Sequence, residues 1–91
     1  IIDLRWLAPL PVDALVRATA GCQNILIVDE CRHSGGPAEA LMAFYTEHTR
    51  TPHARITAKD SFIATGPAYA ATLPSSDGIV AAALALIGGK P

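Results

Sequence analysis

The segment NILIVDE at positions 24–30, with a continuous apolar run ILIV at 25–28, places the strongest constraint on the fold of this chain. Its side chains do not alternate between apolar and polar, which is typical of a strand covered on both faces. Helical patterns lie on either side of it: PLPVDALVRATAG at 9–21, where Pro11 suits the first turn, and GGPAEALMAFYTEHT at 35–49. A buried strand between two helices predicts parallel βαβ units, because parallel strands are joined by helical crossovers.

The remaining segments continue the alternation of strand and helix. IIDLRWL at 1–7 is predicted as an opening strand and ARITAK at 54–59 as a short third strand. The segment 60–78 is dense in Gly, Pro, Ser and Thr and is predicted as a structured loop, and SSDGIVAAALALIGG at 75–89 as the last helix. We therefore expect an α/β fold: a single three-layer, Rossmann-like domain with a mostly parallel sheet.

One face of the helix at 35–49 is expected to meet the core. Ala38, Leu41, Met42 and Tyr45 recur at i, i+3, i+4 and i+7, which places them on one side of a helix.

The last helix is apolar on every side. Residues 79–87 include no polar side chain, while Ser75 or Ser76 suits its start and Gly88 its end. A helix that is apolar all round is usually buried all round. In a chain of 91 residues, this predicts that one face of the helix meets another domain or subunit.

Composition excludes several classes of protein. A hydrophobic content of 51% with 16% charged residues argues against disorder, and a net charge of −1 gives no reason to expect nucleic acid or an anionic membrane as partner. The longest apolar run, 79–87, is too short to span a bilayer. Two cysteines without a disulfide-scaffold pattern indicate a reducing compartment, so we expect a cytoplasmic protein.

The segment DECRHS at 29–34 holds many of the side-chain types used in catalysis. Asp29, His33 and Ser34 are neighbours in sequence, but a working triad is assembled in space, mostly from separate segments, and the pattern G-x-S-x-G is absent. Ser34 is instead expected to cap the following helix. We expect no catalytic residue here.

Metal and phosphate sites are also poorly supported. Cys22 and Cys31 lie nine residues apart and match no zinc pairing with His33 or His48. Cys31 stands beside a basic residue and before a helix, a setting that can lower a thiol pKa, but a partly buried, inert cysteine is the preferred interpretation. The Gly-Gly pair at 35–36 lacks the lysine of a P-loop. Loops at the carboxyl ends of strands commonly form ligand sites or interfaces, and we favour an interface.

Three segments in this order and spacing resemble the C-terminal domain of the transketolase-like family. They are IIDLRWLAPLPVDAL, ILIVDECRHSGGPAEAL and DSFIATGPAYAATLPSSDGIVAAAL, so the resemblance spans residues 1–91. The pattern D-L-R-x-x-x-P-L and the acidic-loop GG…AE segment are most similar to the beta part of thiamine-diphosphate-dependent 2-oxoacid dehydrogenases of the pyruvate and branched-chain type.

The resemblance implies a part of an enzyme with no catalytic, cofactor or metal residue of its own. Thiamine diphosphate and magnesium would be bound by other domains, and this domain would assemble a dimer and dock the lipoyl-bearing acyltransferase subunit. Members of the family carry one more strand and helix before the segment at 1–7. We therefore expect a fragment of a larger chain, whose open strand edge pairs with another copy, swaps domains or rearranges.

The expected residue roles are structural. Glu30 and Arg32 would make polar interface contacts, a tight turn would lead into the helix, and the loop after the third strand would be shaped by polar and glycine residues. The complete set is Glu30, Arg32, Ser34, Gly35, Gly36, Asp60, Ser61, Thr65 and Gly66. Two other classes of function stay open: a non-catalytic interaction module, and a domain of a transketolase-type enzyme that transfers ketol groups.

Overall fold

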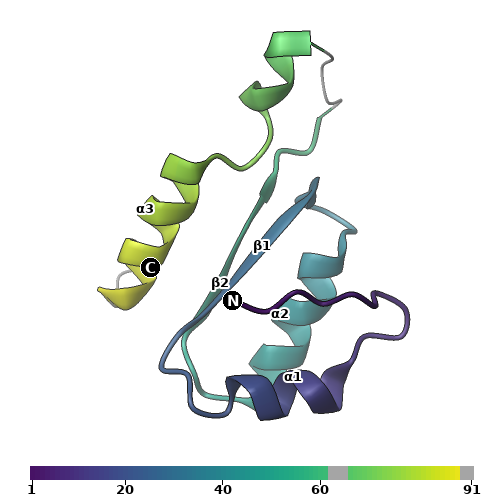
Figure 1. Ribbon diagram of the computed structural model, residues 1–91, viewed down its shortest axis with the longest axis vertical. Coiled ribbons are helices and arrows are strands. Elements are labelled where there is room, and N and C mark those ends of the chain that lie inside the picture. The colour runs from purple at the N-terminus through teal and green to yellow at the C-terminus, as the bar shows by residue number, and fades with distance from the viewer. Residues whose placement is uncertain (62–65, 89–91) are drawn as a thin grey trace.

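The computed structural model describes residues 1–61 and 66–88. The elements are α1 (Val12–Thr19), β1 (Ile25–Arg32), α2 (Pro37–His48), β2 (His53–Ala58), the 3-10 helix η1 (Gly66–Ala71) and α3 (Ser76–Ile87). Figure 1 shows three layers, with α3 on one side of the sheet and α2 on the other. This confirms the α/β fold, although the structure describes a sheet of two strands only.

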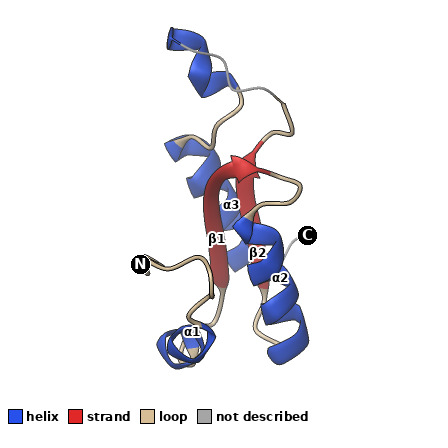
Figure 2. Cartoon of the chain, turned by 90° about the vertical axis from the view of Figure 1, so that its right-hand side faces the viewer, coloured by secondary structure: helices blue, strands red, loops and turns tan. Residues whose placement is uncertain are grey.

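The two strands are parallel, as predicted for a βαβ unit. Ile25 lies opposite His53 and Val28 opposite Ile56, with an irregular register between Val28 and Arg32. The helix α2 is the crossover between the strands, and it covers one face of them (Figure 2). The carboxyl ends of β1 and β2 therefore lie at the same edge of the sheet.

The main core lies between β1 and the pair of helices α1 and α2. Its buried side chains come from all three elements: Leu15, Ile27, Ala38, Leu41 and Tyr45. The predicted apolar face of α2 is thereby confirmed, since three of its four residues are buried and Met42 packs against the cluster.

The expected strand at 1–7 is absent, and this prediction was wrong. Arg5 has φ 63°, in the left-handed region, and the Trp6 N–H bonds to the Leu4 carbonyl at 2.7 Å. These features form a γ-turn that interrupts an extended backbone. A strand also needs a neighbour that satisfies its backbone groups, and no described strand pairs with this segment.

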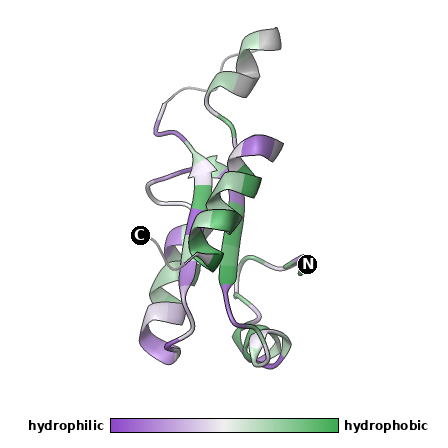
Figure 3. Ribbon diagram, turned by 90° about the vertical axis from the view of Figure 1, so that its left-hand side faces the viewer, coloured by the Kyte–Doolittle hydropathy of each residue, from purple (hydrophilic) through white to green (hydrophobic). Residues whose placement is uncertain are grey.

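The helix α3 begins where the sequence predicted but is less buried than expected. The Ser75 hydroxyl accepts a hydrogen bond from the Gly78 N–H at 3.0 Å, and Gly88 is the C-cap. No residue of α3 is buried within this chain, and contact of one of its faces with another domain or subunit stays a prediction. Figure 3 looks onto α3, whose ribbon is coloured as hydrophobic over most of its length. The exposed large side chains on it are Val80, Leu84 and Ile87.

The segment after β2 is an irregular loop that includes η1, while residues 62–65 lie outside the described part of the chain. The accessible surface of the whole chain is 6677 Å². A compact monomer of this mass exposes about 5,000 Å². The chain thus leaves open a large amount of surface that a compact domain would bury.

Among the residues that the structure describes, no helix has the length and apolar character needed to cross a membrane.

Candidate functional site

The loops that follow β1 and β2 meet at one edge of the sheet. β1 ends at Arg32, which lies opposite Ala58 near the end of β2. Residues 33–36 then lead into α2, and residues 59–61 leave β2 beside them. Loops at the carboxyl ends of parallel strands form most ligand and interface sites in α/β sheets, which makes this edge the candidate site.

Asp29 organises the first of these loops from within β1. One carboxylate oxygen accepts a hydrogen bond from the Cys31 N–H at 2.9 Å, and the other accepts from the Ala38 N–H at 3.1 Å. Ala38 lies in the first turn of α2, where N–H groups have no partner within the helix. Asp29 therefore ties the end of β1 to the start of α2 and stabilises the positive end of the helix dipole.

The two glycines before α2 are required for different reasons. Gly35 has φ +77°, a backbone conformation that side-chain-bearing residues rarely adopt, and its N–H donates to Glu39 Oε2 at 2.8 Å. Gly36 has an ordinary φ, but an added Cβ would lie 3.0 Å from the Arg32 carbonyl oxygen and 3.2 Å from the Cys31 Cβ. The tight turn predicted before α2 is therefore a place where the backbone at Gly36 passes close to the backbone at Arg32.

Ser34 joins the loop after β1 to the loop after β2. Its N–H donates to Asp60 Oδ1 at 2.8 Å and its hydroxyl to Asp60 Oδ2 at 2.5 Å. These two hydrogen bonds, first the one from the hydroxyl, hold the pKa of the exposed Asp60 carboxyl below its usual value. The expectation that Ser34 caps the helix is wrong, because its hydroxyl bonds to Asp60 instead.

His33 is held between two residues of β2. Arg55 donates from Nη1 to the His33 carbonyl at 2.6 Å, and its Nη2 lies 2.9 Å from His33 Nε2. Because a guanidinium can only donate, Nε2 is the acceptor in this contact and the ring proton lies on Nδ1. That proton lies toward Thr57 Oγ1, at 3.1 Å. Both nitrogens of the imidazole thus bond side chains of β2 and hold the loop against that strand.

This arrangement does not form a hydrolytic triad. Asp29 bonds backbone N–H groups, His33 bonds Arg55 and Thr57, and Ser34 bonds Asp60. A nucleophilic serine needs a base in contact with its hydroxyl, and here the hydroxyl meets a carboxylate whose pKa is lowered.

The described residues of the site also offer no suitable set of donors for a metal or a phosphate. Within the described residues, no group of three or more His, Cys, Asp and Glu side chains gathers in a way that could hold a metal ion. The amides of Ser34, Gly35 and Ala38 already donate to carboxylates, which would repel an anion. Carboxylate bonding thus occupies the N–H groups that a phosphate would need.

Cys31 is exposed, which contradicts its expected partial burial. The hydrogen bond and the negative charge of Asp29 raise the pKa of the Cys31 thiol above its ordinary value. The neighbouring Arg32 suggested a setting that stabilises the thiolate. The contacts with Asp29 have the opposite effect and favour the unreactive thiol.

Most of the predicted site residues come together. Five of the nine line one open hollow of about 480 Å³ at the strand ends: Arg32, Ser34, Gly35, Asp60 and Ser61. Gly36 adjoins the hollow as the N-cap of α2, and Glu30 is an exposed residue of β1. Gly66 begins η1 with φ +66°, while Thr65 lies outside the described residues.

Sequence reasoning missed four residues that build the site. Asp29 was considered only as a triad member, and Glu39, Arg55 and Thr57 were not singled out. The Glu39 contact had a local signal, since a glutamate in the first turn of a helix often bonds an N–H before it. Arg55 and Thr57 carried none, because their contacts to His33 join segments 22 and 24 residues apart.

Comparison with known proteins identifies the family. The family described as "Transketolase, C-terminal domain" matches residues 1–79, which is most of the chain. No curated protein and no solved structure matches it. The matched range covers α1, β1, α2, β2 and the beginning of α3. The chain therefore belongs to the transketolase C-terminal domain family, whose members are parts of thiamine-diphosphate-dependent enzymes.

Proposed function

We propose that this chain is the C-terminal domain of a cytoplasmic thiamine-diphosphate-dependent 2-oxoacid dehydrogenase of the pyruvate or branched-chain type. The whole enzyme would decarboxylate a 2-oxoacid and transfer the acyl group to a lipoyl arm. This domain would assemble the oligomer and dock the lipoyl-bearing acyltransferase subunit. The family membership supports the thiamine-dependent context, and the D-L-R-x-x-x-P-L segment at 3–10 supports the dehydrogenase type.

One observation supports a structural role: the potentially reactive side chains of the site form hydrogen bonds to other parts of the chain. Asp29, His33, Ser34 and Asp60 each bond the backbone or side chains of neighbouring segments. A catalytic group needs at least one reactive atom free to meet a substrate. In this loop, the groups suited to acid–base chemistry hold the two strand ends together instead.

Two charged side chains remain available for a partner. Glu30 and Arg32 are exposed, and within the described part of the chain neither side chain makes a hydrogen bond or an ion pair. They lie at the end of β1, beside the loop anchored by Asp29 and Ser34. Charges at such a rim speed association and select the partner rather than supply most of the affinity.

The described residues do not fit thiamine diphosphate or its magnesium ion. A diphosphate needs free N–H groups or cations, and the amides at the start of α2 face the carboxylates of Asp29, Glu39 and Asp60. Magnesium needs several oxygen ligands around one point, and no such group is found in the described ranges. The proposal therefore assigns the binding of both, and the chemistry that they support, to other domains of the enzyme.

Turnover by the polypeptide that contains this domain tests the enzyme class. We expect thiamine-diphosphate-dependent release of CO₂ from pyruvate or a branched-chain 2-oxoacid, with electrons passed to an artificial acceptor. Transfer of a ketol group between sugar phosphates, without 2-oxoacid oxidation, would instead identify a transketolase-type enzyme. If neither reaction occurs with added cofactor and magnesium, the domain is a non-catalytic interaction module.

Docking is tested separately by calorimetry with the subunit-binding domain of the acyltransferase. We expect binding that weakens when Glu30→Lys or Arg32→Glu reverses a charge at the strand end. Glu47→Lys is the matched control, because Glu47 is also exposed but lies in the last turn of α2, at the other end of that helix. Equal affinity for the three variants and the unmodified chain would exclude this edge as the docking surface.

A further inference from the structure

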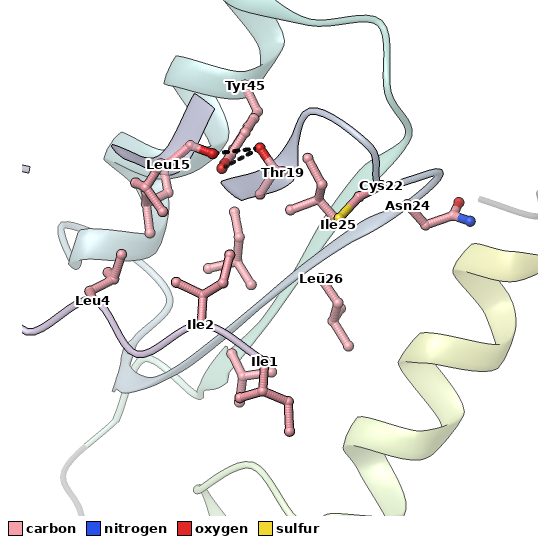
Figure 4. Close-up of a pocket in the computed structure, with 13 residues that line it drawn as sticks. Ile1, Ile2, Leu4, Leu15, Thr19, Cys22, Asn24, Ile25, Leu26 and Tyr45 are labelled. Carbon is pink, nitrogen blue, oxygen red and sulfur yellow. Dashed lines mark hydrogen bonds between the residues drawn. The ribbon is translucent and has the colours of Figure 1, made fainter. Parts of the chain in front are cut away.

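We draw no further inference here: the strongest candidate, the largely apolar groove of about 270 Å³ between β1 and the N-terminal segment (Figure 4), carries nothing, since nothing in the part of the chain that the structure describes shows what covers it.

Discussion

Ser34 and Asp60 form a two-point contact that joins the loops after β1 and β2 across 26 residues of sequence. Both oxygens of the Asp60 carboxylate accept hydrogen bonds, one from the Ser34 N–H and one from its hydroxyl. The ionised carboxylate makes the stronger contact, because both of its oxygens then accept and the hydrogen bonds are charge-assisted. The strand-end site is therefore sensitive to the charge of a single exposed side chain.

The first prediction concerns the pH dependence of this contact. The pKa of Asp60 is lowered from 3.8 in the folded chain, so its stabilising effect is complete above about pH 4 and is lost as the pH falls through the folded value. We expect Asp60→Asn to lower the melting temperature at pH 7, with the difference from the unmodified chain shrinking toward pH 3. Thermal unfolding followed by circular dichroism measures both. A difference that does not depend on pH would contradict the assignment.

The second prediction concerns the turn before α2. Gly35 has φ +77°, so Gly35→Ala should cost about 1–2 kcal/mol in the free energy of unfolding. Gly21→Ala is the control, because no atom lies within 4 Å of the added Cβ and its φ is not in the left-handed region. That change should be neutral or stabilise by up to about 1 kcal/mol. Urea denaturation of the two variants should therefore shift in different directions or by clearly different amounts.

The helices were predictable from the sequence because their signals are local. The apolar face of α2 and the Ser75 cap of α3 follow from spacing and from the identity of neighbouring residues. The segment at 1–7 has strand-forming residues but no strand, since a strand depends on a neighbour that the sequence does not specify. The burial of α3 depends in the same way on its surroundings, so its apolar residues alone do not determine how much of it this chain covers.

The site was predictable as a location but not as a set of contacts. The position of Ser34 and Gly35 after β1 and of Asp60 after β2 indicated that these residues share one edge of the sheet. The bonds from Ser34 to Asp60 and from Arg55 to His33 depend on the register of the two strands. The register of two strands cannot be read from a single sequence, so these contacts are seen only in the three-dimensional structure.

The third prediction concerns the reactivity of Cys31. Asp29 raises the pKa of this thiol, so labelling at pH 8 should be slower than for an unperturbed cysteine. Asp29→Asn removes the charge and should accelerate the labelling of Cys31. Both measurements use a Cys22→Ser background, which leaves one thiol in the chain. Equal labelling rates would refute the role of Asp29.

The raised pKa of Cys31 also predicts a pH dependence of stability. Ionisation of Cys31 opposes folding, so stability should fall as the pH rises through the raised pKa, above about pH 9.

The fourth prediction compares two leucines on opposite sides of the sheet. Leu41 is 5% exposed within the core cluster, so Leu41→Ala should cost about 2–5 kcal/mol in the free energy of unfolding. Leu84 on α3 is 64% exposed, and Leu84→Ala should change stability by less than about 0.5 kcal/mol in the isolated chain. Chemical denaturation checks both values. A large loss from Leu84→Ala would mean that α3 is covered in solution by a surface outside this chain.

The fifth prediction concerns Thr72, in the segment between η1 and α3. Its hydroxyl oxygen is buried without a hydrogen-bond partner among the described residues, and desolvation without compensation is unfavourable. Thr72→Val keeps the shape, removes the hydroxyl and should raise the free energy of unfolding by roughly 1 kcal/mol. Thr57→Val is the matched control, since the Thr57 hydroxyl bonds His33 and the Ala58 carbonyl and its removal should destabilise the fold. Denaturation curves that show a loss for Thr72→Val as large as that for Thr57→Val would mean that the Thr72 hydroxyl is bonded in solution.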